Sequence, residues 1–255
     1  MITHTCRKYV FTAAVLLTAI LLQPFSAHAG IWQVIPIRVD LDQKSRSGVI
    51  TVRNDAEEKL IIRAEAFEWV QNEEGKDAYV PSDELIFFPK VLTVNPKEER
   101  VIRIGIRAPE IKKEKTYRLF LKEEAAPQSD EANKVVIAIQ FGLPIFSKPA
   151  KEEVAGTLQE LSLRDGHLNL IVNNTGNTHF RINTVALSGV DQAGVEQFTQ
   201  ELNGWYLLSG GARTYAALIP EDICRQLKVI QVQVNADRLT LSGKFDVQPD
   251  MCAAQ

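Results

Sequence analysis

The sequence contains few of the residues from which catalytic and metal sites are usually built. It has four histidines and three cysteines in 255 residues. Only His167 and His179 lie beyond residue 30, each in a strand-like stretch without a matching serine, cysteine or metal-ligand partner. P-loop, G-x-G-x-x-G, H-E-x-x-H and G-x-S-x-G motifs are all absent. The net charge of −3 is too small, and of the wrong sign, for a nucleic-acid partner. These absences predict a protein that is not an enzyme and binds no metal, cofactor or nucleic acid.

The N-terminal segment has the three parts of a secretory signal peptide. Arg7 and Lys8 precede the apolar run YVFTAAVLLTAILL, and SAHAG follows it with an A-x-A pattern. We therefore expect residues 1–29 to be a signal peptide that is cleaved before Gly30. A membrane anchor is the alternative, but the run is short for a span and no second span follows. We expect the mature chain to be exported and not inserted in a membrane.

Cys224 and Cys252 are the cysteines that remain once the signal peptide has been removed. In an exported chain two cysteines favour one internal disulfide. Cys224 and Cys252 are 28 residues apart. Closing a loop of this length adds roughly 3–4 kcal/mol to the free energy of unfolding through chain entropy. Two free thiols are the alternative, and a metal site is not expected because no partner ligands stand nearby.

Nearly every segment after the signal peptide has the pattern of a short β-strand. Seven or so β-rich stretches precede the polar, proline-bearing segment 147–156, and about seven follow it, with no helical period sustained over ten residues. The stretch 220–227 has the composition of a single helical turn, and RDG at 164–166 is typical of a hairpin turn. These patterns predict an all-β protein with two immunoglobulin-like β-sandwiches, at residues 30–148 and 149–255.

The stretch KVVIAIQFGLPIFSKP at 134–149 is more apolar than a sandwich strand normally is. One face of an extended chain would carry six large apolar side chains: Val135, Ile137, Ile139, Phe141, Leu143 and Ile145. A sandwich strand normally exposes alternate polar residues to water, and long apolar edges promote aggregation. Two interpretations are open. The strand is either central and covered on both faces, or near an edge and presented to another protein.

Four stretches resemble the periplasmic chaperones of the chaperone–usher pathway, the PapD-like family. They are PIRVDLDQKSRSGVITVRN, TYRLFLKE, VVIAIQFGLPIFSKP and NNTGNTHFRI, and the resemblance covers essentially all of residues 31–250. FGLPIF and GWYLLSGGARTY are more similar to the archaic branch than to the classical P-pilus branch. The resemblance implies two immunoglobulin-like domains in a boomerang arrangement and a location in the periplasm. It also implies that the protein folds and caps pilus subunits without ATP and delivers them to an outer-membrane usher.

The resemblance assigns a role to the apolar strand. In this family the last strand of the first domain, here residues 134–147, is lent to a pilus subunit that lacks its own final strand. The donor positions fall on Val135, Ile137, Ile139 and Phe141. The second of the two interpretations above, an apolar row presented to another protein, is the one that the resemblance supports.

The family also binds the C-terminal carboxylate of the subunit with two basic residues. Arg38, in PIRV, matches the first of them. The second is a lysine late in the donor strand of classical members, but Pro144 stands there in this sequence and has neither a charge nor an N–H. We expect Arg118 to replace that lysine, because a guanidinium group suits a carboxylate, with Lys122 as the second candidate. A solvated surface arginine is the alternative interpretation of Arg118.

Two other classes of protein fit the sequence less well. An exported adhesion or structural protein with two sandwiches would use its strands only for its own core. A secreted hydrolase would need a catalytic set that the chain lacks. The sequence leaves open which subunit is bound, which residues contact an usher, and whether the free chaperone caps itself as an oligomer.

Overall fold

β-Strands make up nearly all of the regular structure. The computed structural model describes residues 32–72, 74–107, 111–124 and 138–252, all of which fall within one compact unit. The helical elements in these ranges are the short helix α2 (Glu221–Cys224) and the 3₁₀ turn η1 (Pro249–Met251). No helix in this part of the chain is long and apolar enough to cross a membrane. The predicted signal peptide, residues 1–29, lies outside the described residues.

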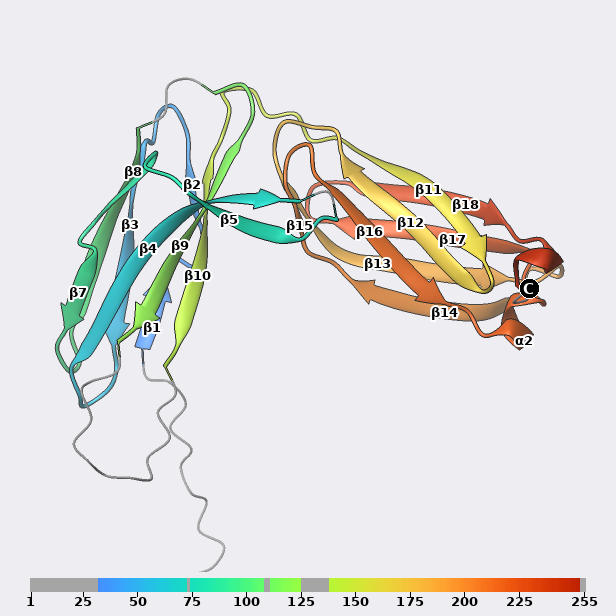
Figure 1. Ribbon diagram of the computed structural model, residues 1–255, viewed down its shortest axis with the longest axis horizontal. Helices are drawn as coiled ribbons and strands as arrows, with labels where there is room; N and C mark the ends of the chain where they lie inside the picture. Colours follow the sequence, from blue (N-terminus) through green and yellow to red (C-terminus); the bar gives the residue numbers. More distant parts are fainter. Residues whose placement is uncertain (1–31, 73, 108–110, 125–137, 253–255) are drawn as a thin grey trace, which may run out of the picture. The chain divides into compact units, whose positions relative to one another are not determined.

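The first sandwich packs a four-stranded sheet against a six-stranded sheet (Figure 1). The four-stranded sheet has the order β1 (Trp32–Ile35), β3 (Ser47–Asn54), β8 (Glu99–Ile106) and β6 (Leu85–Phe88). The path through the other sheet is β2 (Val39–Leu41), β10 (Gln140–Ser147), β9 (Lys115–Glu123), β4 (Leu60–Gln71) and β5 (Asp77–Pro81), and β7 (Val91–Val94) pairs with β4. Because β1 and β2 belong to different sheets, the chain changes sheets between them.

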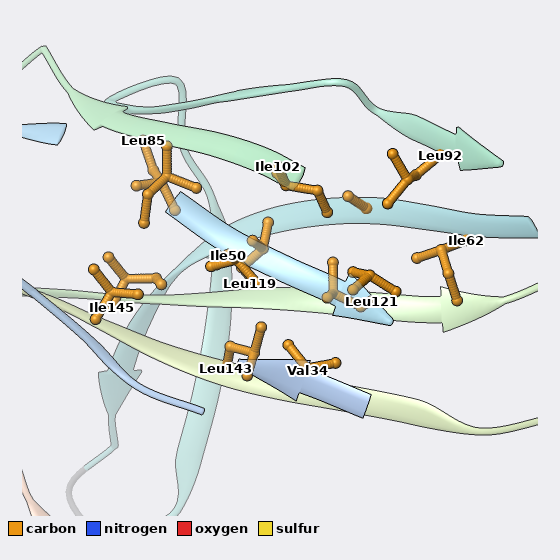
Figure 2. Close-up of a cluster of buried hydrophobic side chains, with 14 of the residues drawn as sticks. Val34, Ile50, Ile62, Leu85, Leu92, Ile102, Leu119, Leu121, Leu143 and Ile145 are labelled. Atoms are coloured by element: carbon orange, nitrogen blue, oxygen red, sulfur yellow. The ribbon is translucent and has the colours of Figure 1, made fainter. Parts of the chain in front are cut away.

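Alternation along the strands builds the core of the first sandwich. Leu119 on β9 and Leu143 on β10 point into the space between the sheets, where they meet Ile50 of β3 and Ile102 of β8 (Figure 2). Each of these side chains is almost completely removed from water. Burial of one such side chain contributes about 1.5–3 kcal/mol to the free energy of unfolding, so this shared core holds the two sheets together.

The second sandwich has a three-stranded and a five-stranded sheet (Figure 1). The first of these has the order β11 (Gly156–Arg164), β12 (His167–Asn174) and β16 (Ala212–Leu218). The path through the other is β14 (Glu196–Asn203), β13 (Phe180–Val190), β17 (Val229–Ala236) and β18 (Thr240–Asp246), and β15 (Tyr206–Leu207) pairs with β13. Asp165 and Gly166 join β11 to β12, both with positive φ as a two-residue hairpin turn requires.

The predicted fold class, two β-sandwiches, is confirmed, but the described residues contain more strands than the sequence patterns predicted. The β-rich stretch 31–41 is divided between two sheets as β1 and β2, and the β-rich stretch 84–94 is divided into β6 and β7. Proline stands at both breaks, as Pro36 and Pro89, and has no N–H to continue a ladder. The predicted domain boundary after residue 148 falls between β10 and β11 and stays a prediction.

The predicted disulfide between Cys224 and Cys252 is present in the structure. It joins α2 to the residue that follows η1, and both sulfur-bearing side chains lie in the core of the second sandwich. The bridge therefore fixes the segment that contains η1 to the body of that sandwich.

We expect thiol labelling of the denatured, unreduced mature protein to find no free thiol. Replacing both cysteines by serine should lower the free energy of unfolding by roughly 3–4 kcal/mol, because the unfolded chain is then no longer closed into a loop. Chemical denaturation of the two proteins measures this difference. Two reactive thiols per chain would contradict the disulfide.

Candidate functional site

Two arginines flank Pro144 on the outer face of the six-stranded sheet. Pro144 pairs with Arg118 of β9, and the next residue of β10, Ile145, pairs with Val39 of β2. Arg38 comes directly before Val39 and therefore falls beside Pro144 on the other side. Two strand spacings, roughly 10 Å, separate the backbones of the two arginines. We call the outer face of the sheet around Arg38, Pro144 and Arg118 the arginine face.

Arg118 is a buried cation that pairs with no carboxylate among the described residues. Only 7% of the residue is exposed, and its Cζ lies 3.8 Å from the centre of the Trp69 ring. Nη1 donates to the backbone oxygen of Gly142 at 2.9 Å, whereas Nε is buried and has no hydrogen-bond partner among the described residues. Burial lowers the pKa of Arg118 from its ordinary value, but an arginine stays protonated at neutral pH. The alternative of a solvated surface arginine is therefore wrong.

Arg38 is held differently from Arg118. Its Nε and Nη2 donate to the two carboxylate oxygens of Asp40, at 3.0 and 2.8 Å. Burial alone would lower the pKa of Arg38, but the hydrogen bonds and charge of Asp40 outweigh it and raise that pKa. Burial would likewise raise the pKa of Asp40, but its hydrogen bonds with Arg38 and the charges of Arg38 and Lys148 hold it below its ordinary value. The pair is therefore charged at neutral pH and partly open to water.

Aromatic rings support both guanidinium groups. Trp69 and Phe146 are completely buried, with ring centres 6.1 Å apart. Arg38 lies over Phe146, with its Cζ 4.7 Å from the ring centre, and Arg118 lies over Trp69. A cation over an aromatic face gains electrostatic energy while its N–H groups stay free to bind in the plane of the guanidinium. The rings therefore hold the two cations in place without neutralising their charge.

Lys122, the second candidate for the carboxylate anchor, lies at a distance from this pair. It shares a face of β9 with Arg118, but four residues further along, which is roughly 13 Å. Its side chain is exposed and no ion pair holds it among the described residues. The geometry brings Arg38 and Arg118 together beside Pro144 and leaves Lys122 outside that group.

The predicted donor positions lie at or beyond one end of β10. Val135 and Ile137 lie outside the described residues. Ile139 and Phe141 are half-buried and pack against the margin of the first core, where Phe141 meets Trp32 edge-to-face at 4.6 Å. The apolar row therefore begins in the core, at Ile145, and becomes more exposed towards Ile139.

β10 has an open edge over the same stretch. It pairs with β9 along its whole length, but β2 pairs with it only from Ile145 to Ser147. From Gln140 to Pro144 no described strand pairs with the other edge of β10. Another extended chain can therefore add to the sheet beside the half-buried part of the apolar row.

The sequence patterns did not indicate two residues near this face, Asp40 and Glu114. Asp40 was not predicted, although Arg38 and Asp40 are two apart in an extended segment and so must share a face. His179 is completely buried, its Nδ1 lies 2.7 Å from Glu114 Oε2, and its ring stacks on Phe146 at 3.7 Å. The partner Glu114 is far away in sequence, so no local pattern could have shown the contact.

Comparison with known proteins finds a family model that matches the first sandwich and solved structures that share the fold. Residues 32–153 match a family model described as "Pili and flagellar-assembly chaperone, PapD N-terminal domain". No curated protein matches the sequence. A structure of the CsuC–CsuE chaperone–tip adhesion subunit complex from archaic Csu pili of Acinetobacter baumannii contains a chain with 18% identity and a TM-score of 0.52, over 73% of this chain and 90% of that one.

Two further structures share the fold. The complex of the SafA pilin with the SafB chaperone of Salmonella enterica contains a chain with 11% identity and a TM-score of 0.54, over 86% of this chain and 98% of that one. The YadV chaperone has 10% identity and a TM-score of 0.55, over 84% of this chain and 98% of its own. At these identities the likeness to solved structures shows the fold.

The missing ion pair of Arg118 leads to a prediction about stability. Replacing a buried charge by an apolar side chain of similar reach is often neutral or stabilising. We therefore expect Arg118→Met to leave the melting temperature unchanged or to raise it by about 2–4 °C. Thermal melts followed by circular dichroism measure the change. A large drop in melting temperature would mean that Arg118 is retained for stability and not for binding.

Proposed function

Because the chain belongs to the PapD-like family of pilus and fimbrial assembly chaperones, we propose that it captures subunits lacking their final strand by donor-strand complementation. Family members are chaperones and not enzymes. The captured subunit would receive β10, together with the residues just before it, as the strand that it lacks. This gives the open edge and the apolar row of β10 one common purpose.

The observation that carries this proposal is the state of β10 between Gln140 and Pro144. One edge of this stretch is paired with β9, and the other has no partner strand among the described residues. Its apolar row is only half-buried by the protein's own core at Ile139 and Phe141. Strand addition supplies main-chain hydrogen bonds to such an edge, and the apolar side chains then enter the core of the partner.

The apolar row can supply much of the binding energy. Burial of one large apolar side chain is worth roughly 1.5–3 kcal/mol. The proposed donor residues are Val135, Ile137, Ile139 and Phe141. Two of the solved structures named above contain a chaperone together with a pilin or an adhesion subunit. That partnership supports the same class of partner here.

The arginine face is the proposed anchor for the C-terminal carboxylate of the subunit. Arg118 has one donor, Nε, that makes no hydrogen bond to the described residues, and a charge that no described carboxylate neutralises. Arg38 presents a second guanidinium on the other side of Pro144. A carboxylate bound beside Pro144 would set the starting point from which the subunit's last segment pairs along β10. Lys122 stays an alternative anchor, for a carboxylate that binds further along β9.

The proposal includes a location and a second partner. We propose that residues 1–29 direct the chain to the periplasm, where the chaperone would deliver its subunits to an outer-membrane usher. A free chaperone with an open apolar edge has an aggregation hazard. Association of two copies through β10 would cover that edge until a subunit arrives.

The donor row can be tested against a matched core position on the same face. Ile139→Ser should lower the chaperone's own free energy of unfolding by only about 1 kcal/mol, because the side chain is half-exposed. Ile145→Ser should cost on the order of 2–5 kcal/mol, because Ile145 is completely buried. Ile137→Ser should resemble Ile139→Ser. Thermal melts of the purified variants, together with subunit levels in the same periplasm, measure both effects.

Selective loss of subunit with Ile137→Ser or Ile139→Ser, at a nearly unchanged melting temperature, is the expected result. The donor-strand proposal fails if these variants melt as early as Ile145→Ser and show no selective loss of subunit. Pull-down from periplasm and mass spectrometry would identify the bound subunit. Recovery of a glycan or host ligand alone would favour an adhesion protein instead.

The anchor leads to a separate prediction. Arg38→Met and Arg118→Met should each reduce the yield of chaperone–subunit complex at least tenfold while the chaperone stays folded. Each variant removes a charged hydrogen bond to the carboxylate, worth roughly 1.5–3 kcal/mol. Lys122→Met is the matched control and should capture normally. Normal capture with Arg118→Met and loss with Lys122→Met would transfer the anchor to Lys122.

A further inference from the structure

Arg38 and Arg118 differ in what already occupies them. Arg38 makes the two parallel hydrogen bonds to Asp40 that an arginine makes with a bound carboxylate. Arg118 makes no contact of this kind with any described residue. One of the two guanidinium groups, that of Arg38, is therefore already paired with a carboxylate of the chain itself. The other, that of Arg118, is paired with no described carboxylate.

Asp40 has a second cationic neighbour besides Arg38, so it keeps a counter-charge if it releases Arg38. Its Oδ1 also lies 3.4 Å from the Nζ of Lys148, the residue that follows β10. The side chain of Asp40 is 37% exposed, so water can replace the bonds that it gives up. Lys148 in turn lies 3.8 Å from Glu152, which pairs with Arg238 at 2.7 Å. The charges alternate along this chain of contacts, and Asp40 keeps a cationic neighbour when Arg38 turns away.

The position of Asp40 follows from the register of the first sandwich. Asp40 pairs with Phe146 across β2 and β10, and Arg38 lies over the same Phe146 ring. The two side chains therefore meet on the arginine face beside Phe146. A carboxylate that approaches Arg118 across Pro144 comes near Arg38 from the β10 side, whereas Asp40 lies two residues further along the chain.

Resting on the function proposed above, we infer that Asp40 is an internal carboxylate that occupies Arg38 until the C-terminal carboxylate of a subunit displaces it. Arg118 is then the group that binds the incoming carboxylate first, and Arg38 is recruited second. An anion that reaches only Arg38 gains little, because it must replace an existing pair. A chain-terminal carboxylate that reaches both arginines gains a new pair at Arg118, so Asp40 favours it over other anions.

The test uses the purified mature protein and two synthetic octapeptides of alternating valine and threonine. One peptide ends in a free carboxylate and the other in a carboxamide, and calorimetry measures the Kd of each. We expect Asp40→Asn to bind the free-carboxylate peptide about fivefold more tightly than the wild type does, and to bind the carboxamide peptide equally. Glu152→Gln removes the same charge without touching Arg38, and should leave both Kd values unchanged.

The order of binding can be tested with one further substitution. Arg118→Met should abolish the preference for the free carboxylate in the wild-type background, where Arg38 is occupied. In the Asp40→Asn background it should leave part of that preference, because Arg38 is then free. If Arg118→Met reduces the preference for the free carboxylate equally in the two backgrounds, the proposed order of binding, Arg118 before Arg38, is wrong.

The outcomes separate this inference from the proposed function. A wild-type preference for the carboxylate, with no more gain for Asp40→Asn than for Glu152→Gln, overturns the role of Asp40 and leaves the proposed function intact. If no variant distinguishes the two peptides, the carboxylate site itself is refuted and the inference falls with it. Donor-strand capture is then still measured independently by the subunit levels of the Ile139→Ser variant.

Discussion

The register of β10 against β9 is the constraint on which both the core and the proposed binding surface depend. One parity of β10 sends Leu143 and Ile145 into the core, and the other sends Pro144 and Phe146 to the arginine face. Because the side-chain period of a strand is two, a slip of one residue would exchange these sets. It would place Pro144 in the core and expose Ile145. The packing that stabilises the first sandwich therefore also positions the groups that would bind a subunit.

Local patterns in the sequence predicted the fold class, the hairpin at Asp165 and Gly166, and the disulfide. The fold class depends on the alternation of apolar and polar residues, and the hairpin depends on its turn residues; both are visible within short stretches of sequence. The disulfide follows from the small number of cysteines. The number of strands was underestimated because Pro36 and Pro89 each divide an extended stretch that otherwise looks continuous. The apolar row of β10 was apparent in the sequence, but how much of it is buried was not.

The arrangement of the arginine face could only be inferred by resemblance. Arg38 and Arg118 lie far apart in sequence, and they come together because β2 and β9 flank β10 in one particular register. That no described carboxylate pairs with Arg118 is a property of the folded protein, since it depends on every neighbouring strand. The pairing of Asp40 with Arg38, in contrast, could have been predicted from the sequence, because residues two apart in an extended segment lie on the same face.

Pro144 has a consequence for the main chain of β10. Opposite residues in an antiparallel pair alternate between those that exchange hydrogen bonds and those whose N–H and C=O point away from the partner. Ile139 accepts a main-chain hydrogen bond from the β9 side, so the residues of the other parity, Gln140 and Gly142, point their main-chain groups to the open edge. Pro144 shares their parity but has no N–H, and the series of donors along that edge ends there. An added strand that slid past Pro144 would lose hydrogen bonds, so the imino acid limits the alignment of any strand that pairs with β10.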